Sequence, residues 1–423
     1  MTSASGSGDA LPRRLGLTDS VTIGLGSMIG AGIFAALAPA AGAAGRWLLP
    51  ALAVAALLAY CNATSTARLA ARYPVSGGAY VYGRERLGPF WGYLAGWGFV
   101  VGKTASCAAM ALTVGHYAWP EHARVVAVAT VAAITALNYT GVHKSALATR
   151  ILVGATLLVL TVVVVTGFAG AHTSAAGLTS RIGPGGVLEA AGLLFFAFAG
   201  YARIATLGEE VRAPERTIPR AILISLGIAL VVYALVAAAA LLTLGSAGLA
   251  GSADPLAQVV TAAGAPWLAP LVRIGAVLAA GSSLLALLLG VSRTTLAMAR
   301  DAHLPVALSA VHPRFGVPHR AELVVCAVVA GAVLLFDLRA AIGFSSFTVL
   351  AYYLVANISA GTLRAGEGRP ARWIPVVGAG GCVVVAFALP LHSVLAGLVV
   401  LAVGAGWYVL RDRTVGGRPD GGS

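Results

Sequence analysis

The feature that most constrains this chain is a succession of apolar stretches, each about 20 residues long, from one end of the sequence to the other. A stretch of this length crosses about 30 Å of hydrocarbon as an α-helix. Hydrophobic residues fill 59% of the 423 positions and charged residues only 10%, too little charge to cover a surface in water. We predict an all-α polytopic protein of the lipid bilayer with twelve transmembrane helices. The predicted spans are 18–44, 48–71, 90–118, 123–140, 146–169, 188–211, 218–244, 267–299, 321–337, 340–362, 373–390 and 392–410.

The net charge of +13 is explained by membrane topology. Most of the 28 lysines and arginines fall at alternate ends of the predicted spans, and the positive-inside rule assigns those ends to the cytoplasm. Both termini are then cytoplasmic, with tails at 1–17 and 411–423, and the first of these, rich in Ser and Gly, is expected to be disordered. We expect a multi-pass protein of the plasma (inner) membrane and no nucleic-acid partner.

Two predicted spans are interrupted by glycine. The first has four glycines within residues 24–32, where each weakens a helix by up to about 1 kcal/mol relative to alanine. Either the helix unwinds there, or Gly26 and Gly30 form a close helix–helix contact. The sixth span has Gly200 near its middle, and the two interrupted spans each begin a half of five helices. Paired interruptions of this kind indicate an inverted-repeat transporter with its substrate site between the breaks.

An unwound helix exposes backbone groups that suit a zwitterion. Free N–H groups at a half-helix N-terminus attract a carboxylate, and bare carbonyls at a C-terminal end attract an ammonium group. We therefore predict that the amides of residues 30–32 hold the carboxylate of an amino acid and that the carbonyls of Phe198 and Ala199 hold its amine. Aromatic side chains of residues 196–201 are candidate gates. The full predicted substrate site is Ser27, Met28, Ile29, Gly30, Ala31, Gly32, Phe196, Phe198, Ala199, Gly200 and Tyr201.

Four ordered motifs resemble those of the amino acid–polyamine–organocation (APC) permeases, and together they cover most of residues 18–362. They are GSMIGAGIF at 26–34; LAARYPVSGGAY at 69–80, followed by GW at 96–97; FAFAGY at 196–201 with EE at 209–210 and PERTIPRA at 214–221; and the stretch 293–305 with HP at 312–313. The resemblance implies a LeuT-like core of two inverted repeats, 18–169 and 188–362, with helices 1 and 6 broken. Two peripheral helices follow at 373–410. The implied activity is amino acid transport by alternating access, as secondary active transport that is proton-coupled symport or exchange.

Lys103 lies about 13 residues into the third predicted span, roughly 20 Å from its start. In proton-coupled members of the family that this chain resembles, a lysine on the fifth helix occupies the sodium position of sodium-coupled relatives; here that position aligns with Thr156. The coupling ion is therefore open. Lys103 is a candidate proton carrier, since burial disfavours a charged ammonium group, or else a permanent countercharge in an exchanger or uniporter. Alternatively, Ser282 and Ser283 with the carbonyls of Gly26 and Ile29 form a sodium site that Thr156 would not obstruct.

Members of the family commonly carry an acidic residue just after the glycine–aromatic pair of the sixth helix, where this chain has Ala202 followed by Arg203. Arg203 either favours a substrate with a second carboxylate or, as we expect, forms an ion pair with Glu209 or Glu210. The eight histidines show no i, i+4 pair, and the acidic residues form no D-x-x-D or H-E-x-x-H motif. We therefore expect no metal site, no cofactor and no enzymatic activity. A channel would need repeated filter residues, which we do not find. A non-transporting amino acid sensor with the same fold remains a rival.

Overall fold

The computed structural model describes residues 15–74, 77–140, 146–170, 184–205, 210–313 and 315–415. These residues are almost entirely helical, and the one strand-like contact among them is an isolated bridge between Leu15 and Val211. Leu15 is thus already ordered within the stretch predicted as a tail. The long helices are α3 (Leu48–Arg72), α5 (Pro89–Ala118), α6 (Ala123–Tyr139), α7 (Ala146–Ala169), α10 (Pro214–Ala250), α12 (Ala269–Arg300), α13 (His319–Leu335), α14 (Leu338–Gly361), α15 (Trp373–Ala388) and α16 (Leu391–Val415).

The prediction of a polytopic helical membrane protein is confirmed. Each predicted span coincides with a long helix or with a broken one. Among the described residues, nine segments are long and apolar enough to cross a membrane; the first of them, Leu17–Arg72, contains two predicted spans. Helices α13 and α15, with 17 and 16 residues, are shorter. Two short helices lie outside the predicted spans, α4 (Ala79–Leu87) and α11 (Pro255–Ala262). The division into inverted repeats at 18–169 and 188–362 stays a prediction.

Both predicted helix breaks are present. The first span consists of α1 (Leu17–Ile29) and α2 (Gly32–Ala44), which are separated by Gly30 and Ala31. The sixth consists of α8 (Pro184–Phe198) and α9 (Ala202–Ala205), joined by one 3-10 turn, η4 (Ala199–Tyr201). Helix α1 packs against η4, so the two interruptions lie next to each other.

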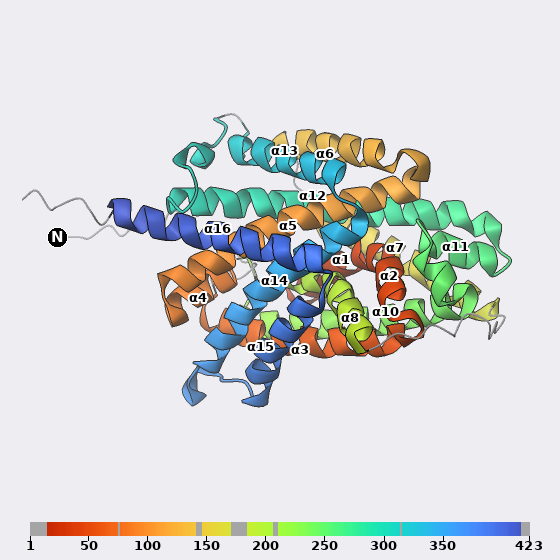
Figure 1. The fold of residues 1–423 in the computed structure, drawn as a ribbon, viewed down its shortest axis with the longest axis horizontal. Helices are drawn as coiled ribbons and strands as arrows, with labels where there is room; N and C mark the ends of the chain where they lie inside the picture. Colours follow the sequence, from red (N-terminus) through yellow and green to blue (C-terminus); the bar gives the residue numbers. More distant parts are fainter. Residues whose placement is uncertain are drawn as a thin grey trace, which may run out of the picture.

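The helices divide into a buried centre and an exposed periphery. In the most apolar part of α5, 83% of the residues are buried, whereas the corresponding share for α16 is 22%. Helix α16 lies across the outside of the bundle, and α6 and α13 lie side by side along one edge (Figure 1). The long α5 and α12 run alongside each other and pack together (Figure 1), and each also contacts the first broken helix, α12 through α1 and α5 through α2. This supports the prediction that the last helix is peripheral.

Glu367, in the linker between α14 and α15, ties that linker to α3 and α4. It forms ion pairs with Arg86 (2.6 Å) and Arg72 (3.4 Å) and accepts a hydrogen bond from the backbone N–H of Arg364 (2.8 Å). The Arg364 N–H and, second, the Arg86 guanidinium lower the pKa of the Glu367 carboxyl from 4.5 to about 2. These contacts join segments that are far apart in the sequence.

Because the folded-state pKa of Glu367 lies below its value in the unfolded chain, its contribution to stability is present at neutral pH and is lost as the pH falls from 4.5 towards about 2. We therefore expect Glu367→Gln to lower the thermal unfolding temperature in detergent at about pH 7, and the difference from wild type to shrink at about pH 3. An equal difference at both pH values would contradict this account. Glu121→Gln, an exposed carboxylate on another linker, is the control.

Candidate functional site

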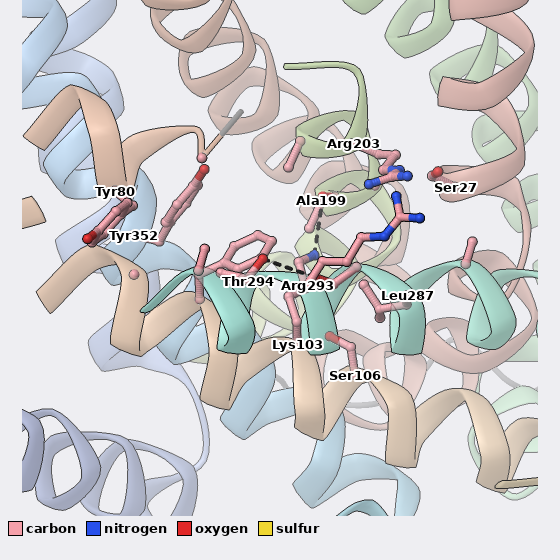
Figure 2. A pocket seen from close by; sticks show the side chains of 18 of the residues that line it. Ser27, Tyr80, Lys103, Ser106, Ala199, Arg203, Leu287, Arg293, Thr294 and Tyr352 are labelled. Atoms are coloured by element: carbon pink, nitrogen blue, oxygen red, sulfur yellow. Dashed lines mark hydrogen bonds between the residues drawn. The ribbon is translucent and has the colours of Figure 1, made fainter. Parts of the chain in front are cut away.

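A cavity of about 490 Å³ lies where the two helix breaks meet the facing sides of α5 and α12. The breaks contribute Gly32 and the turn Ala199–Gly200. Helix α5 contributes residues between Gly96 and Met110, and α12 contributes one face from Ser283 to Met298, followed by Asp301 just beyond its end. Helix α4 and Tyr352 of α14 line one end (Figure 2). The cavity therefore runs from the middle of the bundle along the halves of α5 and α12 nearest α4.

The glycines at the breaks allow the backbones to approach closely. A Cβ atom at Gly200 would lie 2.3 Å from the carbonyl oxygen of Ser27, and one at Gly32 would lie 2.4 Å from the Cα of Ala197. At Gly30 a Cβ would lie 1.6 Å from the Oγ of Ser283. The two alternatives for the first span, unwinding and close contact, thus hold together: the helix is interrupted at Gly30, and Gly30 also packs tightly against α12.

Lys103 points from α5 into the cavity towards the break of the sixth span (Figure 2). Its side chain is buried, and its Nζ donates a hydrogen bond of 3.4 Å to the carbonyl oxygen of Ala199. The Nζ also lies 5.9 Å from the centre of the Phe99 ring, within the range of a cation–π interaction. Lys103 therefore contacts one of the two carbonyls predicted to hold the amine of the substrate.

Two arginines, Arg203 on α9 and Arg293 on α12, also line the cavity. Their guanidinium groups lie near each other (Figure 2), and their charges repel. Glu210, another lining residue, attracts Arg203. The ion pair expected between Arg203 and Glu209 or Glu210 stays a prediction, since Glu210 only attracts Arg203 electrostatically and Glu209 lies outside the described residues.

Tyr233 of α10 joins the two breaks from behind the cavity. Its buried hydroxyl lies 2.6 Å from the carbonyl oxygen of Met28 and 3.0 Å from that of Ala197, and its single hydrogen can be donated to either. The ring packs against Phe198 at a centroid distance of 5.1 Å. Because Met28 and Ala197 lie in the last turns before the two breaks, this one side chain holds both. Tyr233 was not among the predicted site residues, although it is the one aromatic residue within 218–244.

The two ends of the cavity differ. At the α4 end the Oη of Tyr80 donates a hydrogen bond to Asp301 (2.6 Å) and lies 3.0 Å from His303. At the other end, past Gly32, the rings of Phe34 and Tyr117 pack edge to face. The Oη of Tyr117 donates to the carbonyl of Phe34 and accepts from the N–H of Leu256 in α11. Hydrogen bonds and ring packing thus seal the α11 end, whereas the α4 end is lined by charged side chains.

The structure brings about half of the predicted substrate residues to the cavity wall. Ser27, Met28, Gly32, Phe196, Ala199 and Gly200 line it. Ile29, Gly30, Ala31, Phe198 and Tyr201 are not among the lining residues. Tyr201 and Phe198 are fully buried and pack against Tyr353 and Tyr233. Lining residues that the sequence did not single out include Phe99, Ser106, Arg293 and Tyr352.

The sodium-site candidates are only partly brought together. The Oγ of Ser283 donates a 3.0 Å hydrogen bond to the carbonyl of Gly26, so these two oxygens are adjacent. The hydroxyls of Thr156 and Ser282 bond within their own helices, to the carbonyls of Leu152 and Ala279. Hydroxyl and carbonyl oxygens are the ligands that hard cations prefer. Ser283 and Gly26 fit this chemistry. Thr156 is uncharged and therefore brings no positive charge that would exclude a cation.

Two interrupted helices whose breaks meet beside a central cavity are typical of transporters. The chain belongs to the amino acid permease family, whose model matches residues 15–411. It is 66% identical to an "uncharacterized transporter" of Mycobacterium tuberculosis over 95% of this chain and 92% of that one. It is also similar to the branched-chain amino acid permease of Bacillus subtilis (31% identity over 73% of this chain and 72% of that one) and to human cationic amino acid transporter 4 (30% identity over 82% and 59%).

Proposed function

We propose that this protein is a secondary active transporter that moves amino acids across the plasma membrane by alternating access. The observation that carries the proposal is that the cavity is lined by both helix breaks, at Gly32 and at Ala199–Gly200. The amides that begin α2 offer a positive helix end to a carboxylate, and the carbonyl of Ala199 offers an acceptor to a cation. The names of the relatives, which include amino acid permeases, support the same substrate class.

The difference between the ends of the cavity supports alternating access. With both termini in the cytoplasm, as we propose from the charge distribution, the α4 end faces the cytoplasm and the end sealed by Tyr117 and α11 faces outward. The structure then corresponds to an inward-facing state. Opening outward requires Tyr117 to release Phe34 and Leu256.

Counterflow into proteoliposomes tests transport directly. Vesicles that contain the purified full chain are loaded with an unlabelled amino acid and placed in a solution of the same amino acid in labelled form. If that amino acid is transported, they should accumulate the label, and vesicles without protein should not. The unfolding temperature of the detergent-solubilised protein, measured first with each of the twenty amino acids, selects the candidate substrates. A substrate that stabilises the protein yet shows no counterflow would identify a sensor and contradict the proposal.

For the coupling ion we propose the proton, carried by Lys103, with exchange as the other mode. The observation in favour is that a buried lysine contacts the break carbonyl inside the cavity, so that its charge and the bound substrate affect each other. Sodium is the alternative, favoured by the adjacency of the Ser283 hydroxyl and the Gly26 carbonyl.

Two variants separate these modes. If protons couple through Lys103, Lys103→Ala removes the stimulation of uptake by an inward proton gradient, while Ser283→Ala retains it. If sodium couples, Ser283→Ala lowers the sodium stimulation, because one of the cation's oxygen ligands is lost. Uptake is measured in proteoliposomes with imposed proton or sodium gradients. Lys103→Ala uptake that kept the full pH dependence of wild type would refute the lysine as proton carrier.

A further inference from the structure

We infer that the transported amino acid is acidic, with a second carboxylate that pairs with Lys103. This inference rests on the proposed function and adds the class of side chain to it. It depends on the charges of the cavity wall, of which Lys103 is the central one.

Lys103 is a buried cation without an acidic partner in the described part of the chain. Its Nζ has one hydrogen bond there, at the long distance of 3.4 Å and to a neutral carbonyl, and the residue is 6% exposed. A buried charge is costly unless it is paired. A lysine held in this state inside a ligand cavity therefore offers a binding group to an anion that arrives with the substrate.

Positive charge predominates in the rest of the described wall, where Arg84, Arg203 and Arg293 face two carboxylates. Arg203 and Arg293 add two positive charges beside the break, and their mutual repulsion is relieved by any anion that enters between Lys103 and the arginines. Of the two lining carboxylates in the described residues, Glu210 attracts Arg203 and Asp301 accepts a hydrogen bond from Tyr80 at the α4 end. Neither pairs with Lys103.

Amino acids with cationic, neutral and acidic side chains would interact differently with the charged residues of the cavity wall. The ammonium group common to all of them competes with Lys103 for the Ala199 carbonyl. A cationic side chain would add a further charge of the sign that already lines the cavity, and a neutral one would displace Lys103 without offering it a partner. A carboxylate side chain takes up the displaced Lys103 ammonium in a charge-assisted hydrogen bond. Such a pair also holds the proton on Lys103 while the substrate is bound, which agrees with symport.

The test compares glutamate with glutamine, which has the same shape without the charge. In proteoliposomes with the wild-type chain, glutamate should inhibit counterflow at least about 10-fold more strongly than glutamine, and leucine and lysine should inhibit weakly. Lys103→Met should bring the glutamate-to-glutamine ratio to within about 3-fold, and Lys103→Arg, which keeps the charge, should retain a preference for glutamate. Arg124→Gln removes an exposed cation outside the cavity wall and should leave the ratio unchanged.

The outcomes separate the inference from the proposed function. Wild-type protein that transports leucine or glutamine in preference to glutamate would overturn the inference and leave amino acid transport standing. A wild-type preference for glutamate that Lys103→Met retains would overturn the role of Lys103. Absence of counterflow with all twenty amino acids would refute the proposed function itself. If Lys103→Met fails to fold, the glutamate-to-glutamine ratios of the wild type and of Lys103→Arg still test the inference. Absence of a preference for glutamate in either protein would contradict the pairing.

Discussion

Alanine at Gly200 is expected to reduce transport to near background. The added Cβ would lie 2.3 Å from the carbonyl oxygen of Ser27, 2.4 Å from its carbonyl carbon and 2.7 Å from the nitrogen of Met28. All three are backbone atoms, so no side-chain rotation relieves the clash, and the two breaks must move apart. Overpacking of this kind typically costs about 1–3 kcal/mol of stability, or more. Counterflow rate and thermal unfolding in detergent measure the two effects.

The matched control is Gly227→Ala in α10. It makes the same chemical change within a helix, at a position where no atom lies within 4 Å of the added Cβ. Alanine favours a helix over glycine by up to about 1 kcal/mol, so this variant should unfold at the wild-type temperature or above it and should transport normally. Wild-type transport by Gly200→Ala would show that the breaks do not need this close approach.

The second large effect is expected from Tyr233→Phe. Removing one hydroxyl leaves the carbonyls of Met28 and Ala197 without this donor in a buried position. Loss of a buried partner costs about 1–3 kcal/mol, and the phenyl ring keeps its packing against Phe198. We expect a lower unfolding temperature and transport reduced at least about 10-fold, because the two breaks lose their common anchor.

Tyr139→Phe provides the comparison for Tyr233→Phe. Tyr139 lies at the end of α6, outside the cavity lining, and contacts its neighbours His312 and Phe315 through its ring. Deleting its hydroxyl should leave transport unchanged. If Tyr233→Phe lowers stability and leaves transport intact, Tyr233 has a packing role and is not needed to hold the breaks in register.

The helices and both breaks were predictable because each leaves a local trace in the sequence. Long apolar runs define the spans. Glycines at 24–32 and 200 mark the interruptions, because glycine destabilises a helix relative to alanine. Lys103 was also predictable as a functional candidate, because a charge so deep in an apolar span is unusual. The short helices α4 and α11 were not predicted as separate elements, since neither is long enough to cross the bilayer.

The wall of the cavity could be predicted only in part. The register of residues around a break decides which side chains face the substrate, and a single helical position rotates a side chain by about 100°. Met28 therefore lines the cavity while Ile29 is buried behind it, and Phe196 lines it while Phe198 packs against Tyr233. Arg293 and Tyr352 lie on α12 and α14, and the sequence does not specify which face of either helix turns towards the site.

By itself the sequence determined that this is a helical membrane protein, with two interrupted helices and a lysine deep in a third. Those properties follow from composition and local order along the chain. Only the tertiary structure decided that Lys103 reaches the Ala199 carbonyl, that Arg203 lies beside Arg293, and that Tyr233 joins both breaks. Each of these contacts joins residues separated by tens to hundreds of positions, and the packing of helices, which no local pattern specifies, sets the distances between them.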